Sequence, residues 1–183
     1  PPAGRDYLDR IRKACRHTLK LTDDLLTYSR LIRAPLHHER INLSDIAIEI
    51  IGEMRQAEPT RQVETVIAEG MTVSGEATLL RAVMENLLGN AWKYSGKKER
   101  AVIAFGAEER DNRQVYFVRD NGAGFDMAYS SRLFGVFQRL HKAEEFDGTG
   151  VGLATCQRII HRHGGEIWAE AEPGKGATFY FTL

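Results

Sequence analysis

The spacing of apolar residues divides the chain into one long amphipathic helix followed by alternating strands and helices. From Asp6 to Arg33, apolar and small residues recur at intervals of three and four, which is the pattern of a helix that packs against another helix. Pro35 ends this helix or lies just beyond it. The pattern fits either an amphipathic helix lying on its own domain or one half of a helical hairpin in a dimeric bundle. The width of the apolar seam favours the hairpin.

After this helix, short apolar alternations typical of strands are separated by further helical stretches. A possible edge strand at 40–43 precedes a helix that Ser44 can cap. The predicted helices are 44–57, 76–94 and 153–163, and the predicted strands are 63–67, 71–73, 101–105, 114–118, 166–170 and 177–181. Residues Glu69–Gly70 form the turn between the first two of these strands. This order predicts an α+β fold, a two-layer sandwich with helices on one face of a mixed, mostly antiparallel sheet.

Composition limits the size of the protein and the kinds of partner it can have. The 183 residues, 43% of them hydrophobic, can bury one compact core that carries a helical appendage. Lysines and arginines balance aspartates and glutamates at 25 each, so no net charge attracts nucleic acid or an anionic membrane. No signal peptide or membrane-length apolar run is visible, and the two cysteines lie far apart. These features predict a cytoplasmic protein with reduced thiols, and the start at Pro1 suggests a fragment.

Two glycine-rich turns enclose the stretch on which the function depends. The first, 120–124, follows the apolar strand 114–118, and the second, 148–152, runs directly into a helix. Closely spaced glycines allow a backbone to approach a ligand, and the amides at a helix N-terminus attract phosphate. Asp120, at the end of the strand, offers a carboxylate to an amine-bearing base. The two turns therefore predict a nucleotide held between two segments of backbone.

Three polar residues of the helix 76–94 share one stripe: Asn86, Asn90 and Lys93. Asparagine oxygens suit a Mg²⁺ ion whose other ligands are phosphate oxygens and water. Lys93 can meet a phosphate as a point charge, and the neighbouring Tyr94 can lie along a base. Alone, the two asparagines would indicate only a solvated face. Beside two glycine turns, they favour a metal–nucleotide site.

Four segments resemble, in order, the asparagine, first glycine, phenylalanine and second glycine boxes of bacterial sensor histidine kinases. They are ENLLGNAWKYS at 85–95, DNGAGF at 120–125, LFGVFQRLH at 133–141 and GTGVGL at 148–153. The resemblance covers about Arg40 to Leu183. The phenylalanine and second glycine boxes, together with the ending GGEIWAEAEPGKGATFYFTL, are most similar to kinases driven by phytochrome-like, GAF or PAS sensors.

The resemblance implies a Bergerat ATP-binding fold and a role for each matching residue. The catalytic residues would be Asn86, Lys93 and Arg139. Asn86 and Asn90 would hold Mg²⁺, and the side chains of Lys93 and Arg139 would reach the phosphates. Phe134 and Phe137 become apolar pins of a mobile lid, although two ordinary core residues would look the same. The implied nucleotide-binding set is Asn90, Tyr94, Asp120, Gly122, Gly124, Phe134, Phe137, His141, Gly148, Thr149, Gly150, Val151, Gly152, Leu153 and Thr178.

One departure from related ATPases favours a kinase. Those ATPases place a water-activating glutamate one helical turn before the magnesium asparagine, where this chain has Asn86. Glu85 lies about 100° round the helix and would need a rotated helix to serve. Without a general base for water, the γ-phosphoryl group is kept for another acceptor.

That acceptor is missing from the sequence. Histidine kinases phosphorylate a histidine that is followed by an acid and then a proline, and none of the six histidines fits. The resemblance therefore makes 1–36 the second helix of a dimerisation hairpin and 37–183 the catalytic and ATP-binding domain. The chain is expected not to phosphorylate itself.

The resemblance implies a two-component histidine kinase that passes the γ-phosphoryl group of Mg·ATP to a histidine and then to a response-regulator aspartate. Expected partners are ATP and ADP, a second copy through the dimerisation helices, a receiver domain and an upstream sensor. Two alternatives stay open: an anti-sigma type serine kinase, against which the helix 6–33 argues, and a non-catalytic nucleotide-binding module.

Overall fold

The computed structural model describes residues 36–141, 145–146 and 148–183. Nearer the N-terminus it describes Tyr7, Leu8, Ile11, Arg12, Ala14, Cys15, Thr18, Leu19, Leu21, Thr22, Leu25 and Leu26, all of which are helical. The remaining residues of the predicted helix 6–33 lie outside the described residues, and the hairpin interpretation stays a prediction. Among the described residues, no helix is long and apolar enough to cross a membrane.

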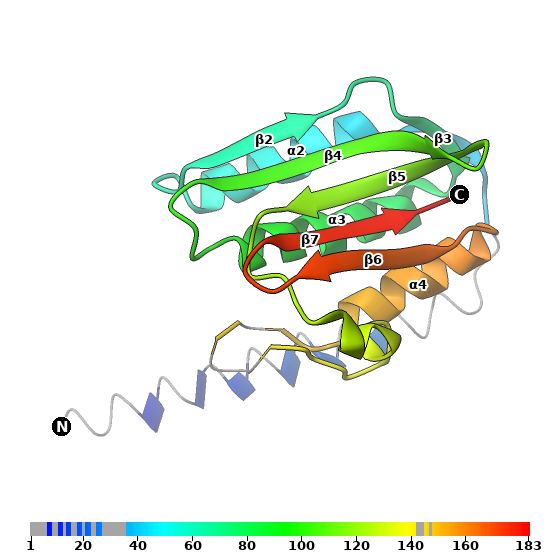
Figure 1. Ribbon diagram of the computed structural model, residues 1–183. Helices are drawn as coiled ribbons and strands as arrows, with labels where there is room; N and C mark the ends of the chain where they lie inside the picture. Colours follow the sequence, from blue (N-terminus) through cyan, green and yellow to red (C-terminus); the bar gives the residue numbers. More distant parts are fainter. Residues whose placement is uncertain are drawn as a thin grey trace.

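The strands form two sheets (Figure 1). The small sheet pairs β1 (Glu39–Asn42) with β3 (Thr72–Gly75) in antiparallel fashion. The five-stranded sheet has the order β2-β4-β5-β7-β6, in which only the β2–β4 pairing is parallel. Its strands are β2 (Val63–Ile67), β4 (Ala101–Arg110), β5 (Arg113–Asp120), β6 (Ile167–Glu172) and β7 (Gly176–Phe181).

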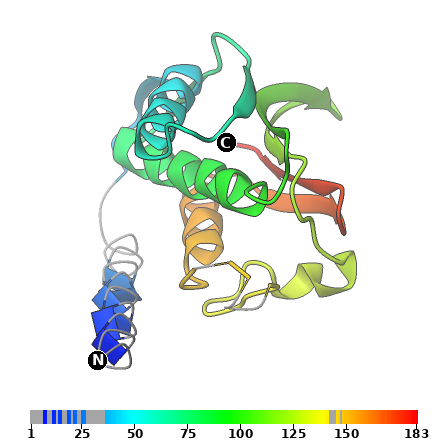
Figure 2. The same ribbon diagram turned by 90° about the vertical axis from the view of Figure 1, so that its left-hand side faces the viewer.

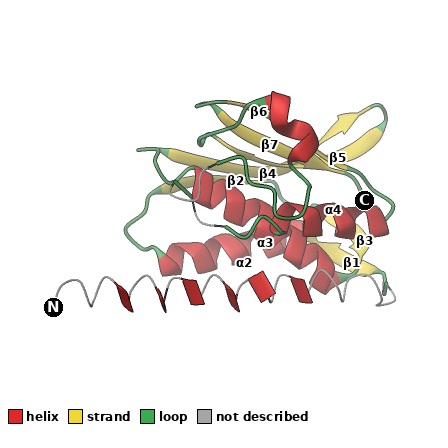
Figure 3. Cartoon of the chain, turned by 90° about the horizontal axis from the view of Figure 1, so that it is seen from below, coloured by secondary structure: helices red, strands yellow, loops and turns green. Residues whose placement is uncertain are grey.

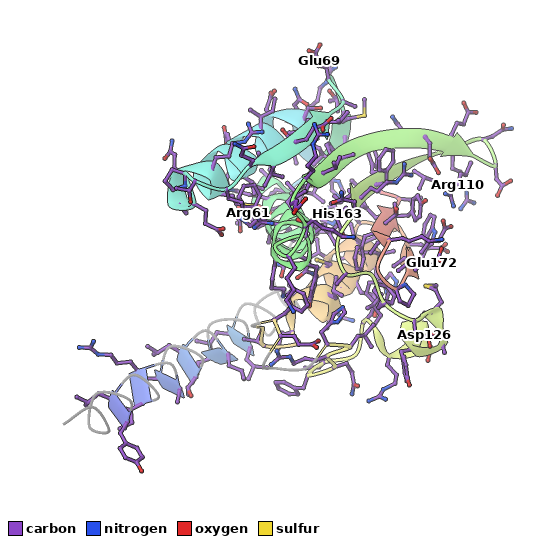
Figure 4. The ribbon with its side chains drawn as sticks, turned by 60° about the vertical axis from the view of Figure 1, so that its left-hand side comes forward. Arg61, Glu69, Arg110, Asp126, His163 and Glu172 are labelled. Carbon is purple, nitrogen blue, oxygen red and sulfur yellow. The ribbon has the colours of Figure 1, made fainter. Side chains whose placement is uncertain are left out.

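The turn at Glu69–Gly70 does not close a hairpin. Instead, β2 pairs with β4, whereas β3 leaves to pair with β1, so the turn stands at the outer end of the molecule (Glu69 is labelled in Figure 4). The sequence pattern located both strands but could not show their partners, because pairing depends on segments far away in the chain.

The helices cover one face of the five-stranded sheet, as Figures 2 and 3 show. They are α2 (Leu43–Ala57), α3 (Ala77–Tyr94) and α4 (Gly152–Arg162), and a 3₁₀ helix, η1 (Met127–Arg132), follows β5. The core lies between the helices and the sheet, and its fully buried side chains include Leu43, Ile50, Leu80, Met84, Leu87, Leu88, Ile103, Phe105, Ile159, Ile160 and Phe181. The predicted α+β sandwich is confirmed.

The start of α2 differs from the sequence prediction. Asn42, not Ser44, caps the helix, because the Asn42 side chain accepts a hydrogen bond from the Ser44 amide at 3.1 Å. The Ser44 hydroxyl instead donates to the Ala68 carbonyl at 2.6 Å and accepts from the Met71 amide at 3.0 Å. Ser44 therefore ties α2 to the connection between β2 and β3.

Two glycines in the turn between β6 and β7 offer a matched test of the packing. Gly174 and Gly176 both have positive φ, +78° and +110°. A Cβ at Gly174 would meet nothing within 4 Å, whereas one at Gly176 would lie 2.0 Å from the Asp120 carbonyl oxygen.

We expect Gly174→Ala to lower the free energy of unfolding by about 1–2 kcal/mol, through backbone strain alone. Gly176→Ala should cost about 1–3 kcal/mol more, because the end of β5 has to move. Urea denaturation of both variants measures the difference. Equal losses would contradict the close approach of β7 to Asp120.

Candidate functional site

A cavity of about 320 Å³ lies where α3, the end of β5, residues 133–141 and 148–150, and the start of α4 meet. Its volume falls within the range of small-molecule sites, roughly 300–1,000 Å³. The predicted site residues that line it are Asn86, Asn90, Lys93, Tyr94, Asp120, Gly124, Arg139, His141, Gly148, Thr149, Gly150, Gly152 and Leu153. The four sequence boxes, far apart along the chain, thus contribute residues to one cavity.

Asp120 supplies a buried carboxylate at one end of this cavity. Its residue is 6% exposed, and its Oδ1 accepts a hydrogen bond from the Gly122 amide at 2.8 Å. Burial raises the pKa of Asp120 to about 6, although hydrogen bonds from the amides of Gly122 and Ala177 lower it. The group is ionised at neutral pH and poorly hydrated, so an N–H donor on a ligand would replace the missing water.

The first glycine turn shapes the surroundings of Asp120 and does not line the cavity throughout. A Cβ at Gly122 would lie 2.5 Å from the carbonyl oxygen of Tyr94, and one at Gly124 would lie 2.0 Å from that of Glu172. Gly124 also has a φ of +59°. Gly122 is outside the lining. Its amide holds the Asp120 carboxylate, its lack of a side chain lets the end of α3 approach, and its contact with a ligand stays a prediction.

Asn86 and Asn90 present two neutral amide groups from one face of α3. The Asn86 Nδ2 donates to the Ala82 carbonyl at 2.8 Å, so its Oδ1 points the other way. A Cβ at Gly152 would lie 2.2 Å from that oxygen, which shows how closely α4 begins against Asn86. Amide oxygens side by side suit Mg²⁺ that also carries phosphate and water ligands. The residues present therefore fit the expected ion.

The second glycine turn leads into the start of α4. Gly150 has a φ of +74°, and its carbonyl accepts from the Phe137 amide at 2.8 Å. No side chain caps α4, and Gly152 and Leu153 in its first turn border the cavity. The first amides of α4 are therefore placed where an anion would bind them.

Tyr94 belongs to a cluster of three rings. His141 and Phe146 lie 5.1 and 4.9 Å from its ring centroid, and the Lys93 Nζ lies 4.3 Å above the ring. Burial raises the pKa of Tyr94, and the charge of Arg139 partly offsets this. Arg139 also donates to the Phe146 carbonyl. These contacts connect Arg139, His141 and Phe146 to the end of α3.

The two phenylalanines predicted as lid pins have different surroundings from each other. Phe137 is 55% exposed and has a φ of +63°, and Phe134 packs partly buried against the core. Neither lines the cavity, and the buried ring of this segment is Phe146. The phenylalanine box could not reveal this, because Phe146 stands outside it among polar residues.

Two other predicted ligand contacts, Val151 and Thr178, are not among the residues that line the cavity, although Val151 stands between Gly150 and Gly152, which do. Val151 is completely buried at the start of α4. Thr178 is on the opposite face of β7, where its hydroxyl accepts from the Arg119 Nε at 3.1 Å. Because side chains alternate along a strand, its neighbours Ala177 and Phe179 line the cavity instead.

Sequence reasoning missed several lining residues. They are Glu85, Gly89, Phe125, Leu133, Gln138, Leu140, Ala177 and Phe179. Glu85 borders the cavity without any rotation of α3, although its carboxylate binds Arg81. The alternation of side chains along β7 could have revealed two of them, because Ala177 and Phe179 lie on the same face of the strand.

The profile of the histidine kinase-, DNA gyrase B- and HSP90-like ATPase family matches residues 75–183. The chain belongs to this ATPase family. This match confirms the resemblance stated from the four sequence boxes, and it shows that the domain is of the ATP-binding class. Its members' shared fold also agrees with the one-sided helix layer described above.

Individual relatives are much longer than this chain. Cyanobacterial phytochrome A of Nostoc sp. (strain PCC 7120) is 37% identical over 163 residues, which are 89% of this chain and 21% of that protein. The methanogenesis regulatory histidine kinase FilI of Methanothrix harundinacea (strain 6Ac) is 34% identical over 168 residues, 91% of this chain and 18% of FilI. Full-length ShkA, solved in complex with AMPPNP, has a TM-score of 0.74 at 26% identity, covering 97% of this chain and 38% of ShkA. This member of the ATPase family therefore spans only about a fifth of these two curated relatives.

The raised pKa of Asp120 predicts how nucleotide affinity depends on pH. Burial favours the neutral carboxyl, so the charged acceptor forms only as the pH rises through about 6. The dissociation constant for Mg·ATP should be flat above about pH 7, rise as the pH falls through 6, and level off about 10- to 100-fold higher once the carboxyl is neutral. Calorimetric titration across this range measures it.

Asp120→Asn should remove this dependence and weaken binding about 10- to 100-fold at pH 7. The variant should unfold at the same or a higher temperature at pH 7, since no buried charge remains. An unchanged pH profile in the variant would contradict the role of Asp120.

Proposed function

We propose that this chain is the catalytic part of a two-component sensor histidine kinase, which transfers the γ-phosphoryl group of Mg·ATP to a histidine outside residues 1–183. The observation that carries the proposal is the meeting of Asp120, the asparagines of α3 and the start of α4 at one cavity. The name of FilI, a regulatory histidine kinase, supports the same activity.

In this proposal the nucleotide lies along the cavity from Asp120 to α4. The Asp120 carboxylate accepts a hydrogen bond from the adenine amine, with Phe125 and Phe179 among the apolar walls. The phosphates lie at the other end, against the first amides of α4. The cavity would thus separate the buried Asp120 carboxylate from the polyphosphate, whose charge it would repel.

Asn86 and Asn90 would hold Mg²⁺, which when bound neutralises charge on the phosphate oxygens. Lys93 and Arg139, both in the lining, would bind the phosphates and stabilise the charge that develops during transfer. Arg139 has to exchange its contact with the Phe146 carbonyl for a phosphate oxygen. The chain therefore contributes positioning and electrostatics, and the acceptor histidine contributes the nucleophile.

The site favours transfer to histidine over transfer to water. The residue one turn before Asn90 is the neutral Asn86, which cannot take a proton from water. Glu85, the other acid in the described lining, accepts a hydrogen bond from the Arg81 Nε through its Oε1 at 3.0 Å. No base is thus aimed at the phosphate end of the described lining.

Proposed partners follow from the N-terminal helix and from the length of the relatives. Leu8, Ile11 and Leu19 are 58–67% exposed, and a second copy pairing through residues 1–36 would cover such apolar side chains. We further propose an upstream sensor, a receiver-domain aspartate that takes the phosphoryl group, and a cytoplasmic location where ATP is available.

Phosphoryl transfer in trans tests the proposal. The chain is incubated with γ-labelled ATP and a separately expressed helical hairpin that carries a histidine box. The hairpin should gain an acid-labile, alkali-stable label, and the chain alone should gain none. Asn86→Ala should reduce the rate about a hundredfold or more, whereas Asn112→Gly, in an exposed turn, should leave it unchanged.

The other outcomes separate the alternatives. Tight binding of Mg·ATP without transfer would indicate a regulatory nucleotide-binding module. An acid-stable label on serine of an added protein would indicate a serine kinase instead. Either result would overturn the histidine kinase proposal.

A further inference from the structure

We propose that Arg81 is a positioning residue that suppresses hydrolysis of bound ATP by holding the Glu85 carboxylate away from the phosphate end of the cavity. The inference rests on the proposed ATP site. Glu85 and Asp120 are the only acids in the described lining, and Asp120 is assigned to the base end. Glu85 is next to the magnesium ligand Asn86, so it is the one carboxylate placed to act on a water near the γ-phosphate.

Arg81 binds three carboxylates through three different nitrogens. Its Nη1 meets Glu49 at 2.7 Å and its Nη2 meets Glu53 at 3.0 Å, one helical turn apart on α2. The remaining Nε donates to Glu85, on the same helix as Arg81, at 3.0 Å. The planar guanidinium has fixed directions, so anchoring two of its nitrogens on α2 fixes where the third must point. The Glu85 carboxylate is turned accordingly.

Helix stabilisation alone does not account for this arrangement. An exposed pair four residues apart contributes little, and an arginine placed before the glutamate is the less favourable order. The cluster also gathers three negative charges around one positive charge, so two remain uncompensated. A cluster that only stabilised the fold would need fewer carboxylates around Arg81. A cluster that fixes the direction of the Glu85 carboxylate needs Glu49 and Glu53 on α2 to hold the guanidinium in place.

Released from Arg81, the Glu85 carboxylate could serve as a general base at the cavity edge. A water oxygen would form a bond to the γ-phosphorus, and the bond from phosphorus to the bridging oxygen would break, its electron pair leaving with ADP. The proton of the water would pass to Glu85 and then to solvent, giving ADP and inorganic phosphate. In the intact site this route is closed, and the nucleotide survives until a histidine arrives.

Phosphate release by this chain with Mg·ATP tests the inference. Arg81→Met should raise the rate of hydrolysis about threefold or more, and Arg81→Lys should raise it less, because lysine keeps a charge but not the fork. The gain should vanish in the double variant Arg81→Met/Glu85→Gln. Arg113→Met removes the same charge from an exposed residue of β5 and should change nothing.

One further readout distinguishes positioning from a general loss of stability. The carboxyl carbon shift of Glu85, assigned by its loss in Glu85→Gln, should respond to Mg·ADP in Arg81→Met and not in the unaltered chain.

An unchanged rate in Arg81→Met, or a gain that persists in the double variant, would overturn the role of Arg81. Mg·ADP affinity, measured by calorimetry for each variant, separates this from a failure of the proposed function. If no variant binds nucleotide, the ATP site itself is wrong and the inference falls with it. If all bind and none hydrolyses faster, only the inference is wrong.

Discussion

The burial of one carboxylate, Asp120, is the constraint on which the rest of the site depends. Backbone approaches from three directions: the end of α3 against Gly122, the end of β6 against Gly124, and the start of β7 against the Asp120 carbonyl. None of these approaches tolerates a Cβ. Burial away from water raises the pKa of the carboxylate, and the amide donors only partly offset this. A ligand that brings a donor of its own would replace the missing water.

The opposite end of the cavity is lined by different chemical groups. There, neutral asparagine oxygens and helix amides replace carboxylates, and the one nearby acid is bound to Arg81. In the proposed complex, a polyphosphate would therefore meet hydrogen-bond donors and a magnesium ion rather than negative charge. The sheet makes this division possible, because β5 delivers Asp120 to one end of the cavity while α3 and α4 deliver their polar groups to the other.

Much of this could be predicted from local patterns. The order of strands and helices follows from apolar periodicity, and the glycine turns mark where backbone must approach backbone. Properties set by distant segments could not be predicted. Neighbouring residues do not determine that Asn42 caps α2, because the cap depends on where the helix begins. They also do not determine which face of the sheet Thr178 occupies, because that depends on the register of β7. The link from Arg81 to Glu49 and Glu53 requires knowing how α2 packs on α3.

Recognition of the purine amine by Asp120 can be measured by comparing the binding of two nucleotides. Inosine diphosphate differs from ADP in carrying an oxygen where adenine carries the amine, so its acceptor would face the carboxylate. Calorimetry at pH 7.5 with Mg²⁺ should show ADP binding about 10- to 100-fold more tightly than inosine diphosphate. Equal affinities for the two nucleotides would contradict the account.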